Sequence, residues 1–276
     1  MSWMDHLLVG KLGNIELEHP IMNAAGVNCK TEDEIKELTK TPVSAIVTGS
    51  FTKEPRNLNT GETLHIADDY SYSINRLGVP NCGIDNVDSS QFKYISPKPF
   101  IISVIVDVDD CEYVIDKCMT FNPDLIELNF SCPNLDDYFP DYDSMVCIMN
   151  KVMHGDRYKQ FLVKLGPTSG LGYWPTLYDY IAGMVVCNTM PMTWGGGIAG
   201  GMGGRALKPI SLGMVQRLQE FASSEVSIIG VGGVYTGQDV QEYLDAGADA
   251  VQIATAHAIW GPKIFDRVLT EWVNLQ

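Results

Sequence analysis

The fold is decided by residues 100–129, which read FIISVIVDVDDCEYVIDKCMTFNPDLIELN. The near-continuous apolar runs Phe100–Val106 and Leu125–Asn129 predict two strands buried on both faces, as parallel strands covered by helices are. Between them, Cys111–Met119 carries apolar residues at helical spacing. This stretch is therefore predicted to form one β–α–β unit of a parallel sheet.

The same alternation continues in both directions along the chain. Six further apolar runs of this kind are Ile21–Ala25, Ala45–Thr48, Phe161–Leu165, Met184–Cys187, Val226–Val231 and Ala250–Ile253. Helical spacing recurs in Glu32–Leu38, Ser144–His154, Pro209–Phe221 and Gln238–Ala246. Eight strand–helix alternations in a chain of 276 residues favour an α/β fold of the (β/α)₈ TIM-barrel type over an open doubly wound sheet.

The ends of the barrel carry their own patterns. Leu8–Gly10 and Ile15–Leu17 are predicted to form a small hairpin that closes the bottom of the barrel. Thr31 and Thr236 stand where helix caps are expected. No shift in composition marks a domain boundary, so residues 1–276 are expected to form a single domain.

Composition excludes several classes of protein. The chain is 45% hydrophobic and 19% charged, which is ordinary for a globular protein and excludes a disordered or fibrous one. Its net charge of −15 should repel phosphate backbones and anionic lipid surfaces. We therefore expect neither nucleic acid nor membrane as a main partner, and a small molecule as the ligand.

The cysteines and the apolar segments indicate a cytoplasmic protein. The seven cysteines form no C-x-x-C pair and lie beside no histidine at ligand spacing, so no metal site is expected and the thiols are expected to be reduced. Met1–Gly10 lacks the apolar core of a secretory signal. No apolar stretch approaches the roughly 18 residues of a membrane span.

Two long connections follow strands and are candidate substrate loops, since loops after the carboxyl ends of barrel strands build the active site. They run from Thr52 to about Gln91 and from Asn188 to Lys208. The second holds the glycine runs Gly195–Gly197 and Gly200–Gly204 around Met202. These glycines predict either a flexible loop or a mobile lid or backbone edge that a cofactor approaches closely.

The motif Glu127–Asn134, ELNFSCPN, leaves the end of the fourth predicted strand. Cys132 lies in a polar loop where barrel enzymes keep catalytic groups. Asn129, Ser131 and Asn134 can hydrogen-bond a flat polar ligand without adding charge. The alternative is a turn with a buried, inert cysteine.

A second motif joins a strand to glycines and a helix start. Ile228–Gly237, IIGVGGVYTG, offers glycine N–H groups that suit a phosphate, and Gln252–Ala256 follows at the next strand end. Lys164 ends the fifth strand and, taken alone, is expected to be solvated at the rim. His65 and His257 have no paired histidine or carboxylate at a fixed spacing and are not expected to be catalytic.

Five segments together resemble the dihydroorotate dehydrogenase family, and most closely its soluble class 1A branch. They are Met22–Val27, Ile74–Asn81, Glu127–Asn134, Val163–Leu165 and Ile228–Gly237. They occur in the family's order and cover nearly the whole chain. The resemblance implies a (β/α)₈ barrel with FMN at the carboxyl-terminal face of its strands, which agrees with the fold predicted above.

The resemblance also implies roles for single residues. Cys132 is similar to the base that removes a C5 proton from dihydroorotate while the C6 hydride passes to flavin N5. Residues that match substrate-binding positions are Asn75, Leu77, Gly78, Val79, Asn129, Asn134, Asn188 and Thr189. Residues that match flavin-binding positions are Ala24, Ala25, Gly26, Ser50, Asn129, Lys164, Gly203, Gly204, Gly232, Gly233, Ala254 and Thr255. A thiol suits the base role because its ordinary pKa of about 8.5 needs only a modest shift to give thiolate near neutrality.

Two departures from the class 1A pattern bear on the substrate. Gly49 stands where that branch has a lysine that touches flavin and substrate, and Lys53 is one hypothesis for its replacement. The loop from Asn188 to Lys208 is short and the chain ends early, at Gln276. These features weaken the expectation of the branch's dimer contacts, although a homodimer is still one expected state, and they leave room for a different substrate.

One alternative is disfavoured and three remain open. A quinone-linked class 2 enzyme is disfavoured because that branch has serine in place of Cys132, whereas a class 1B enzyme would need a separate electron-transfer subunit. A repurposed member could act on another dihydropyrimidine-like or biosynthetic ring. A flavin-binding protein without turnover is the hypothesis from a different functional class.

Overall fold

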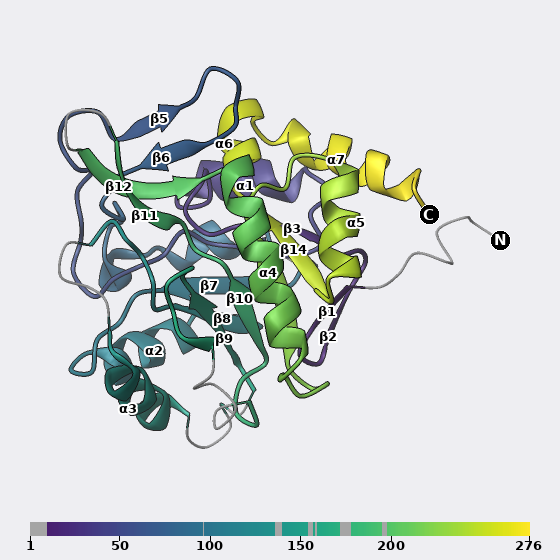
Figure 1. The fold of residues 1–276 in the computed structure, drawn as a ribbon. Coiled ribbons are helices and arrows are strands. Elements are labelled where there is room, and N and C mark those ends of the chain that lie inside the picture. Colours follow the sequence, from purple (N-terminus) through teal and green to yellow (C-terminus); the bar gives the residue numbers. More distant parts are fainter. Residues whose placement is uncertain are drawn as a thin grey trace.

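The computed structural model describes residues 10–276 except 96, 136–139, 154–156, 158, 172–177 and 195–197. Its main body is an eight-stranded parallel sheet with the strand order β3-β14-β13-β10-β9-β8-β7-β4 (Figure 1). These strands are β3 (Ile21–Asn23), β4 (Ile46–Val47), β7 (Phe100–Val104), β8 (Leu125–Asn129), β9 (Phe161–Leu165), β10 (Gly183–Val186), β13 (Ser227–Val231) and β14 (Ala250–Ile253). Each predicted apolar run overlaps one of them, so the predicted parallel barrel is confirmed.

Side chains complete the seam between β3 and β4, the two ends of the sheet order. Asn23 Nδ2 donates a hydrogen bond to the carbonyl of Val47 at 2.6 Å, and the N–H of Val47 donates to Asn23 Oδ1 at 3.0 Å. The N–H of Ser44 also donates to the carbonyl of Ile21 at 3.0 Å. The sheet is thus a nearly closed barrel in which a buried asparagine stands in for part of the missing ladder.

Five of the helices described overlap the predicted helical segments, whereas the two that follow β14 were not predicted. The helices are α1 (Glu32–Thr39), α2 (Cys111–Met119), α3 (Tyr142–Val152), α4 (Lys208–Gln219), α5 (Gly237–Asp245), α6 (Thr255–Trp260) and α7 (Lys263–Val273) (Figure 1). Short 3₁₀ turns are η2 (Ile84–Asn86), η3 (Ser89–Phe92) and η6 (Arg205–Leu207). Thr31 and Thr236 both form capping boxes, with Glu34 and Asp239 respectively, which fixes the starts of α1 and α5.

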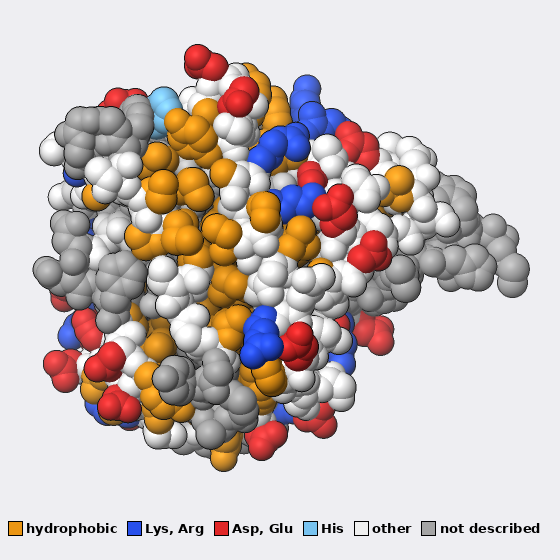
Figure 2. All heavy atoms as spheres, in the orientation of Figure 1, with side chains coloured by type: hydrophobic (Ala, Val, Ile, Leu, Met, Phe, Trp, Pro, Cys, Tyr) orange, Lys and Arg blue, Asp and Glu red, His pale blue; other side chains and the backbone are white. Residues whose placement is uncertain are grey.

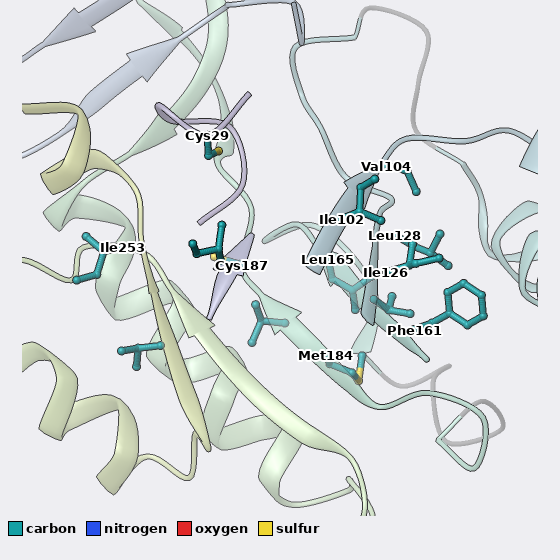
Figure 3. Close-up of a cluster of buried hydrophobic side chains, with 14 of the residues drawn as sticks. Cys29, Ile102, Val104, Ile126, Leu128, Phe161, Leu165, Met184, Cys187 and Ile253 are labelled. Carbon is teal, nitrogen blue, oxygen red and sulfur yellow. The ribbon is translucent and has the colours of Figure 1, made fainter. Parts of the chain in front are cut away.

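Alternation along the strands separates an outer core from the barrel interior. Side chains in one part of the outer core are Ile102, Val104, Ile126, Leu128, Phe161, Leu165 and Met184 (Figure 3). The intervening residues of β8 and β9 belong to the interior, where Leu125 and Leu162 join an apolar cluster. Glu127 and Lys164 are the next interior residues along these strands, so the interior changes from apolar to polar toward the carboxyl ends.

The N-terminal hairpin closes the apolar end of the barrel, as predicted. It consists of β1 (Gly10–Leu12) and β2 (Ile15–Leu17), so its first strand lies two residues later than expected, and residues 8 and 9 lie outside the described part of the chain. Leu12 and Leu17 are almost fully buried in the interior cluster. This placement leaves the opposite end of the barrel for ligands.

The two long connections contain a second sheet that the sequence did not predict. Its strands are β5 (Leu64–Ile66), β6 (Ser73–Asn75), β11 (Met190–Trp194) and β12 (Ile198–Gly203), in the antiparallel order β11-β12-β6-β5 (Figure 1). The expectation of a flexible loop at Gly200–Gly204 is therefore wrong for the β12 part of that run. A Cβ on Gly200 would lie 2.6 Å from the carbonyl oxygen of Asn75, and one on Gly201 would lie 2.1 Å from Thr189 Oγ1. Glycine is needed there for close packing of strands; Gly195–Gly197 lie outside the described residues.

The remaining expectations concern metals, thiols and membranes. All seven cysteines are free thiols. Among the described residues, no group of histidine, cysteine, aspartate or glutamate side chains is arranged to hold a metal ion. None of the helices described is both long and apolar enough to cross a membrane.

Candidate active site

A cavity of about 430 Å³ lies at the carboxyl ends of the barrel strands, against the small sheet. Its walls include Asn129 from the end of β8, Lys164 from β9, Asn75 from β6 and Gly203 from β12. All the residues predicted to bind substrate or flavin line it except Gly78, whereas Ser131 of the Glu127–Asn134 motif lies outside its walls and donates from Oγ to the carbonyl of Lys164 at 3.1 Å. The predicted residues that line the cavity are Ala24, Ala25, Gly26, Ser50, Asn75, Leu77, Val79, Asn129, Cys132, Asn134, Lys164, Asn188, Thr189, Gly203, Gly204, Gly232, Gly233, Ala254 and Thr255.

Gly78 is a neighbour of the wall rather than part of it. It has φ +78°, and a Cβ there would lie 2.5 Å from Asn59 Oδ1. Its carbonyl accepts a hydrogen bond from Arg56 Nε at 3.1 Å. Val79, the next residue, lines the cavity with φ +55°, an unfavourable backbone conformation for a β-branched residue. Gly78 therefore shapes the wall through its backbone.

Cys132 lies three residues beyond β8, with 7% of its surface exposed. It packs in a small apolar cluster with Ile105 and Leu135, against which Val79 also packs. Burial raises the pKa of the Cys132 thiol above its ordinary value, while the backbone N–H of Asn134 and the charge on Lys164 act in the opposite direction. The shift toward thiolate that the sequence suggested is therefore wrong in direction, and the thiol of the free protein is protonated near neutrality.

The four predicted substrate asparagines form two hydrogen-bonded pairs around this thiol. Asn134 Nδ2 donates to Asn75 Oδ1 at 2.5 Å, which links the loop after β8 to the small sheet. Asn188 Nδ2 donates to Asn129 Oδ1 at 3.0 Å. Asn134 Oδ1 is buried and accepts no hydrogen bond from the described residues. It is therefore an acceptor available to a ligand N–H, which is what a pyrimidine ring offers.

A buried polar network forms the floor of the cavity. Lys164 Nζ lies 3.4 Å from Glu127 Oε1, and the two residues are 4% and 0% exposed. Glu127 also accepts hydrogen bonds from Ser103 Oγ at 3.0 Å and from Gln252 Nε2 at 3.1 Å. The expectation of a solvated rim lysine is thus wrong for Lys164, because its charge is held inside the barrel by a carboxylate.

Glycines form another wall that suits an anionic group. Gly204, Gly232 and Gly233 have φ values of +85°, +138° and +65°. Within the described part of the chain, their N–H groups donate to no protein acceptor. A Cβ on Gly233 would lie 2.9 Å from the carbonyl oxygen of Gly204, so the two segments abut. Unpaired N–H groups on closely packed glycines are donors of the kind that binds phosphate.

Sequence reasoning missed several polar residues of the site. Ser103, Glu127 and Gln252 belong to the floor network; Glu127 and Gln252 each begin a segment noted in the sequence, but neither side chain was predicted to belong to the site. The signal that could have identified them is a polar side chain within an otherwise apolar strand. Lys30, from the loop after β3, also lines the cavity and matched no motif.

Two other candidates lie elsewhere. Lys53 is not among the cavity-lining residues; its Nζ lies 5.6 Å from the ring centroid of Tyr113. His257 is buried against Phe265, and burial lowers its pKa to about 4, so it is a neutral core residue near neutrality. This agrees with the expectation that His257 is not catalytic.

A parallel barrel with a polar cavity at the carboxyl ends of its strands is typical of TIM-barrel enzymes that act on small molecules. The family model described as "Dihydroorotate dehydrogenase" matches residues 7–275. The chain therefore belongs to the dihydroorotate dehydrogenase family, as its motifs indicated.

Individual relatives agree with this assignment. Dihydroorotate dehydrogenase A (fumarate) of Lactococcus lactis subsp. lactis is 30% identical over 297 residues, which cover 96% of this chain and 93% of the relative. A putative dihydroorotate dehydrogenase A (fumarate) of Streptococcus pyogenes serotype M1 is 30% identical, over 95% of this chain and 90% of its own length. The crystal structure of ligand-free DHODH from Eimeria tenella shares the fold, with a TM-score of 0.82 at 21% identity over 97% of this chain and 87% of that one.

Proposed function

We propose that this chain is an FMN-dependent oxidoreductase that oxidises dihydroorotate to orotate, a step of pyrimidine biosynthesis. The observation that carries the proposal is the convergence of Cys132 and the asparagines Asn75, Asn129, Asn134 and Asn188 on one cavity. The asparagines offer donors and acceptors for a planar ring, and the thiolate form of Cys132 can accept a proton. Membership of the dihydroorotate dehydrogenase family supports the same reaction.

The cavity fits FMN as the cofactor. Family members are flavoproteins, and the free N–H groups of Gly204, Gly232 and Gly233 suit its phosphate. Lys164, held by Glu127, offers a fixed positive charge to the ring system. FMN would supply the hydride acceptor, and the protein would supply orientation and the base.

In this proposal the residues divide the work. The asparagine pairs hold the dihydropyrimidine ring so that its C5 proton faces Cys132. The thiolate of Cys132 takes that proton and becomes the thiol. The small sheet covers the cavity on the side of Asn75.

The decisive experiment is anaerobic mixing of the FMN-loaded protein with dihydroorotate. Loss of flavin absorbance on the millisecond-to-second scale, with release of orotate, is the expected result. Adding fumarate afterwards tests whether the acceptor in the relatives' names also reoxidises this protein. A flavin that stays oxidised would contradict the proposed substrate, and a protein that binds no FMN would contradict the cofactor as well.

One observation favours a second candidate substrate class. Gly49, at the end of β4, has no side chain with which to contact the ligand. A family member that acts on another dihydropyrimidine-like ring would be consistent with a glycine at this position. Such a protein would bind FMN, but dihydroorotate would not reduce its flavin. A flavin-binding protein without turnover would bind FMN and respond to neither, although the retained Cys132 argues against it.

The rate of flavin reduction is expected to rise with pH. The active form of Cys132 is the deprotonated one, and burial raises the pKa of this thiol above its ordinary value. Well below that pKa, each pH unit increases the thiolate fraction about tenfold, so the rate should rise about tenfold per unit between pH 6 and 8. Stopped-flow reduction at saturating dihydroorotate measures this; a plateau reached below pH 8 would contradict it.

We also propose that residues 1–276 form one domain that acts in the cytoplasm and associates as a homodimer. Hydrophobic side chains gather over the face that carries the small sheet (Figure 2). Leu64 of β5 and Met192 of β11 are 43% and 42% exposed there. Burying such a patch between two copies would stabilise a dimer.

The dimer is tested by sedimentation of the wild type and of Met192→Asp. The wild type is expected to sediment as a dimer. Burying the charged aspartate of Met192→Asp in the interface is unfavourable, so this variant should shift the monomer–dimer equilibrium toward monomer. Exposed Leu275→Asp, at the far C-terminus, is the matched control. A monomeric wild type at micromolar concentration would contradict the dimer.

A further inference from the structure

Two cationic side chains, Lys30 and Lys164, line the cavity in the part of the chain that the structure describes. The ammonium group of Lys164 forms an ion pair with Glu127. Lys30 is different, because no carboxylate oxygen of a described residue lies within 4.0 Å of its Nζ. Lys30 thus forms no close ion pair with a described carboxylate, and Glu34, which also lines the cavity, acts on it at longer range.

The local backbone explains why Lys30 has no acidic partner. Glu34, its nearest acidic neighbour along the helix start, uses Oε2 to accept hydrogen bonds from the backbone N–H of Lys30 at 2.8 Å and of Thr31 at 3.0 Å. This is the capping box of α1. The carboxylate therefore fixes the backbone at Lys30, and its charge acts on the ammonium group only from beyond 4.0 Å.

Gly49 explains where the Lys30 side chain lies. The N–H of Gly49 donates to the carbonyl of Cys29 at 2.7 Å, which brings the loop after β3 against the end of β4. A Cβ on Gly49 would lie 2.3 Å from Lys30 Cγ and 3.0 Å from its Cε. The lysine stem thus occupies the space that any side chain at position 49 would need, and the two cannot coexist without a rearrangement.

We propose that Lys30 supplies the positive charge that holds the anionic ligand beside Cys132, through the space that Gly49 leaves open. For the identity of that ligand, an orotate-like carboxylate, the proposal rests on the function proposed above. Lys30 reaches the cavity from a different loop than position 49. Glycine at position 49 leaves the space that the Lys30 side chain occupies, so the site keeps a positive charge despite the missing lysine at position 49. Burial lowers the pKa of Lys30 from its ordinary 10.5, and an anion bound beside it would favour the charged form again.

The first test measures orotate affinity of the FMN-loaded protein by its flavin difference spectrum. Lys30→Gln is expected to raise the dissociation constant at least about tenfold, because a close charge pair in a partly buried site is lost. Lys30→Arg should recover part of the affinity. Lys53→Gln, which removes a cation outside the cavity, should bind like the wild type. Equal affinity of Lys30→Gln and wild type would overturn the role in orotate binding.

A second test uses the relation between positions 30 and 49. Gly49→Ala alone should displace Lys30 and weaken orotate binding in the same direction as Lys30→Gln. In the Lys30→Ala background the space is vacant, so adding Gly49→Ala should change neither affinity nor melting temperature further. Additive effects of the two substitutions would overturn the inferred packing.

A third readout needs neither turnover nor orotate. Iodoacetate is an anion and iodoacetamide is neutral, so the ratio of their rates at Cys132, followed by peptide mass spectrometry, reports positive charge near the thiol. Lys30→Gln is expected to lower this ratio about threefold to tenfold. If the wild type does not bind orotate but Lys30→Gln lowers the ratio, the result would support Lys30 as the positive charge near Cys132 and contradict the proposed substrate. An unchanged ratio would overturn Lys30 even if dihydroorotate is oxidised.

Discussion

Replacing Cys132 with alanine is expected to slow reduction of the bound flavin by dihydroorotate about 10²–10⁴-fold, the usual contribution of a positioned general base. The geometry gives the reason. The thiol lines the same cavity as the four asparagines, and it lies in an apolar cluster with Ile105 and Leu135. The expected pH dependence should disappear in the same variant, because the titrating group is gone.

The control for this prediction is ligand binding. Cys132→Ser is nearly isosteric, and both variants should bind FMN and orotate within a few fold of the wild type, since the asparagine pairs are intact. Stopped-flow absorbance measures reduction, and orotate titration measures binding. A loss of less than about tenfold in the alanine variant, with wild-type binding, would mean that another group accepts the proton.

The barrel could be predicted from the sequence because its strands are encoded locally. Apolar runs such as Phe161–Leu165 are buried on both faces, and this leaves a continuous hydrophobic pattern that single-sequence reasoning detects. The cap at Thr236 is equally local, since it depends on Asp239 three residues later. Motif positions at the ends of these strands then converge on one cavity because the carboxyl ends of parallel strands share one edge.

The small sheet could not be predicted in the same way. Strands β6 and β12 pair over a separation of more than one hundred residues, and β12 is rich in glycine, which disfavours strands intrinsically. Here glycine is required by the distance to Asn75 and Thr189 rather than by flexibility. Tertiary contact overrides local propensity in this strand.

Lys30 was missed for a related reason. Its position beside Gly49 depends on a hydrogen bond between two loops, and neither loop contains a pattern that indicates the other. The family resemblance indicated a missing lysine at position 49, and Lys53, four residues along the chain, was the hypothesis for its replacement. The structure instead has a lysine from nineteen residues earlier lying over the glycine, because the ends of β3 and β4 are neighbours across the barrel seam.

Lys164→Met is expected to lower the free energy of unfolding of the cofactor-free protein by about 3–5 kcal/mol, the usual cost of removing one partner from a buried ion pair. The reason is Glu127, which is 0% exposed and would be left buried without the ammonium group that lies 3.4 Å away. The hydrogen bonds from Ser103 and Gln252 would remain but cannot replace a countercharge. Urea unfolding followed by circular dichroism measures the loss.

A double variant separates the structural role of Lys164 from its proposed role toward FMN. Lys164→Met with Glu127→Gln removes both charges, and the amide oxygen can still accept from Ser103, so most of the stability should return. FMN affinity, measured by flavin fluorescence, should stay low in both variants because each lacks the lysine charge that is proposed to contact the flavin. If the double variant is as unstable as the single one, then packing around residue 164, and not the unpaired carboxylate, dominates the loss. If it also regains wild-type FMN affinity, then Lys164 serves the barrel interior alone, and the positive charge of the site comes from Lys30.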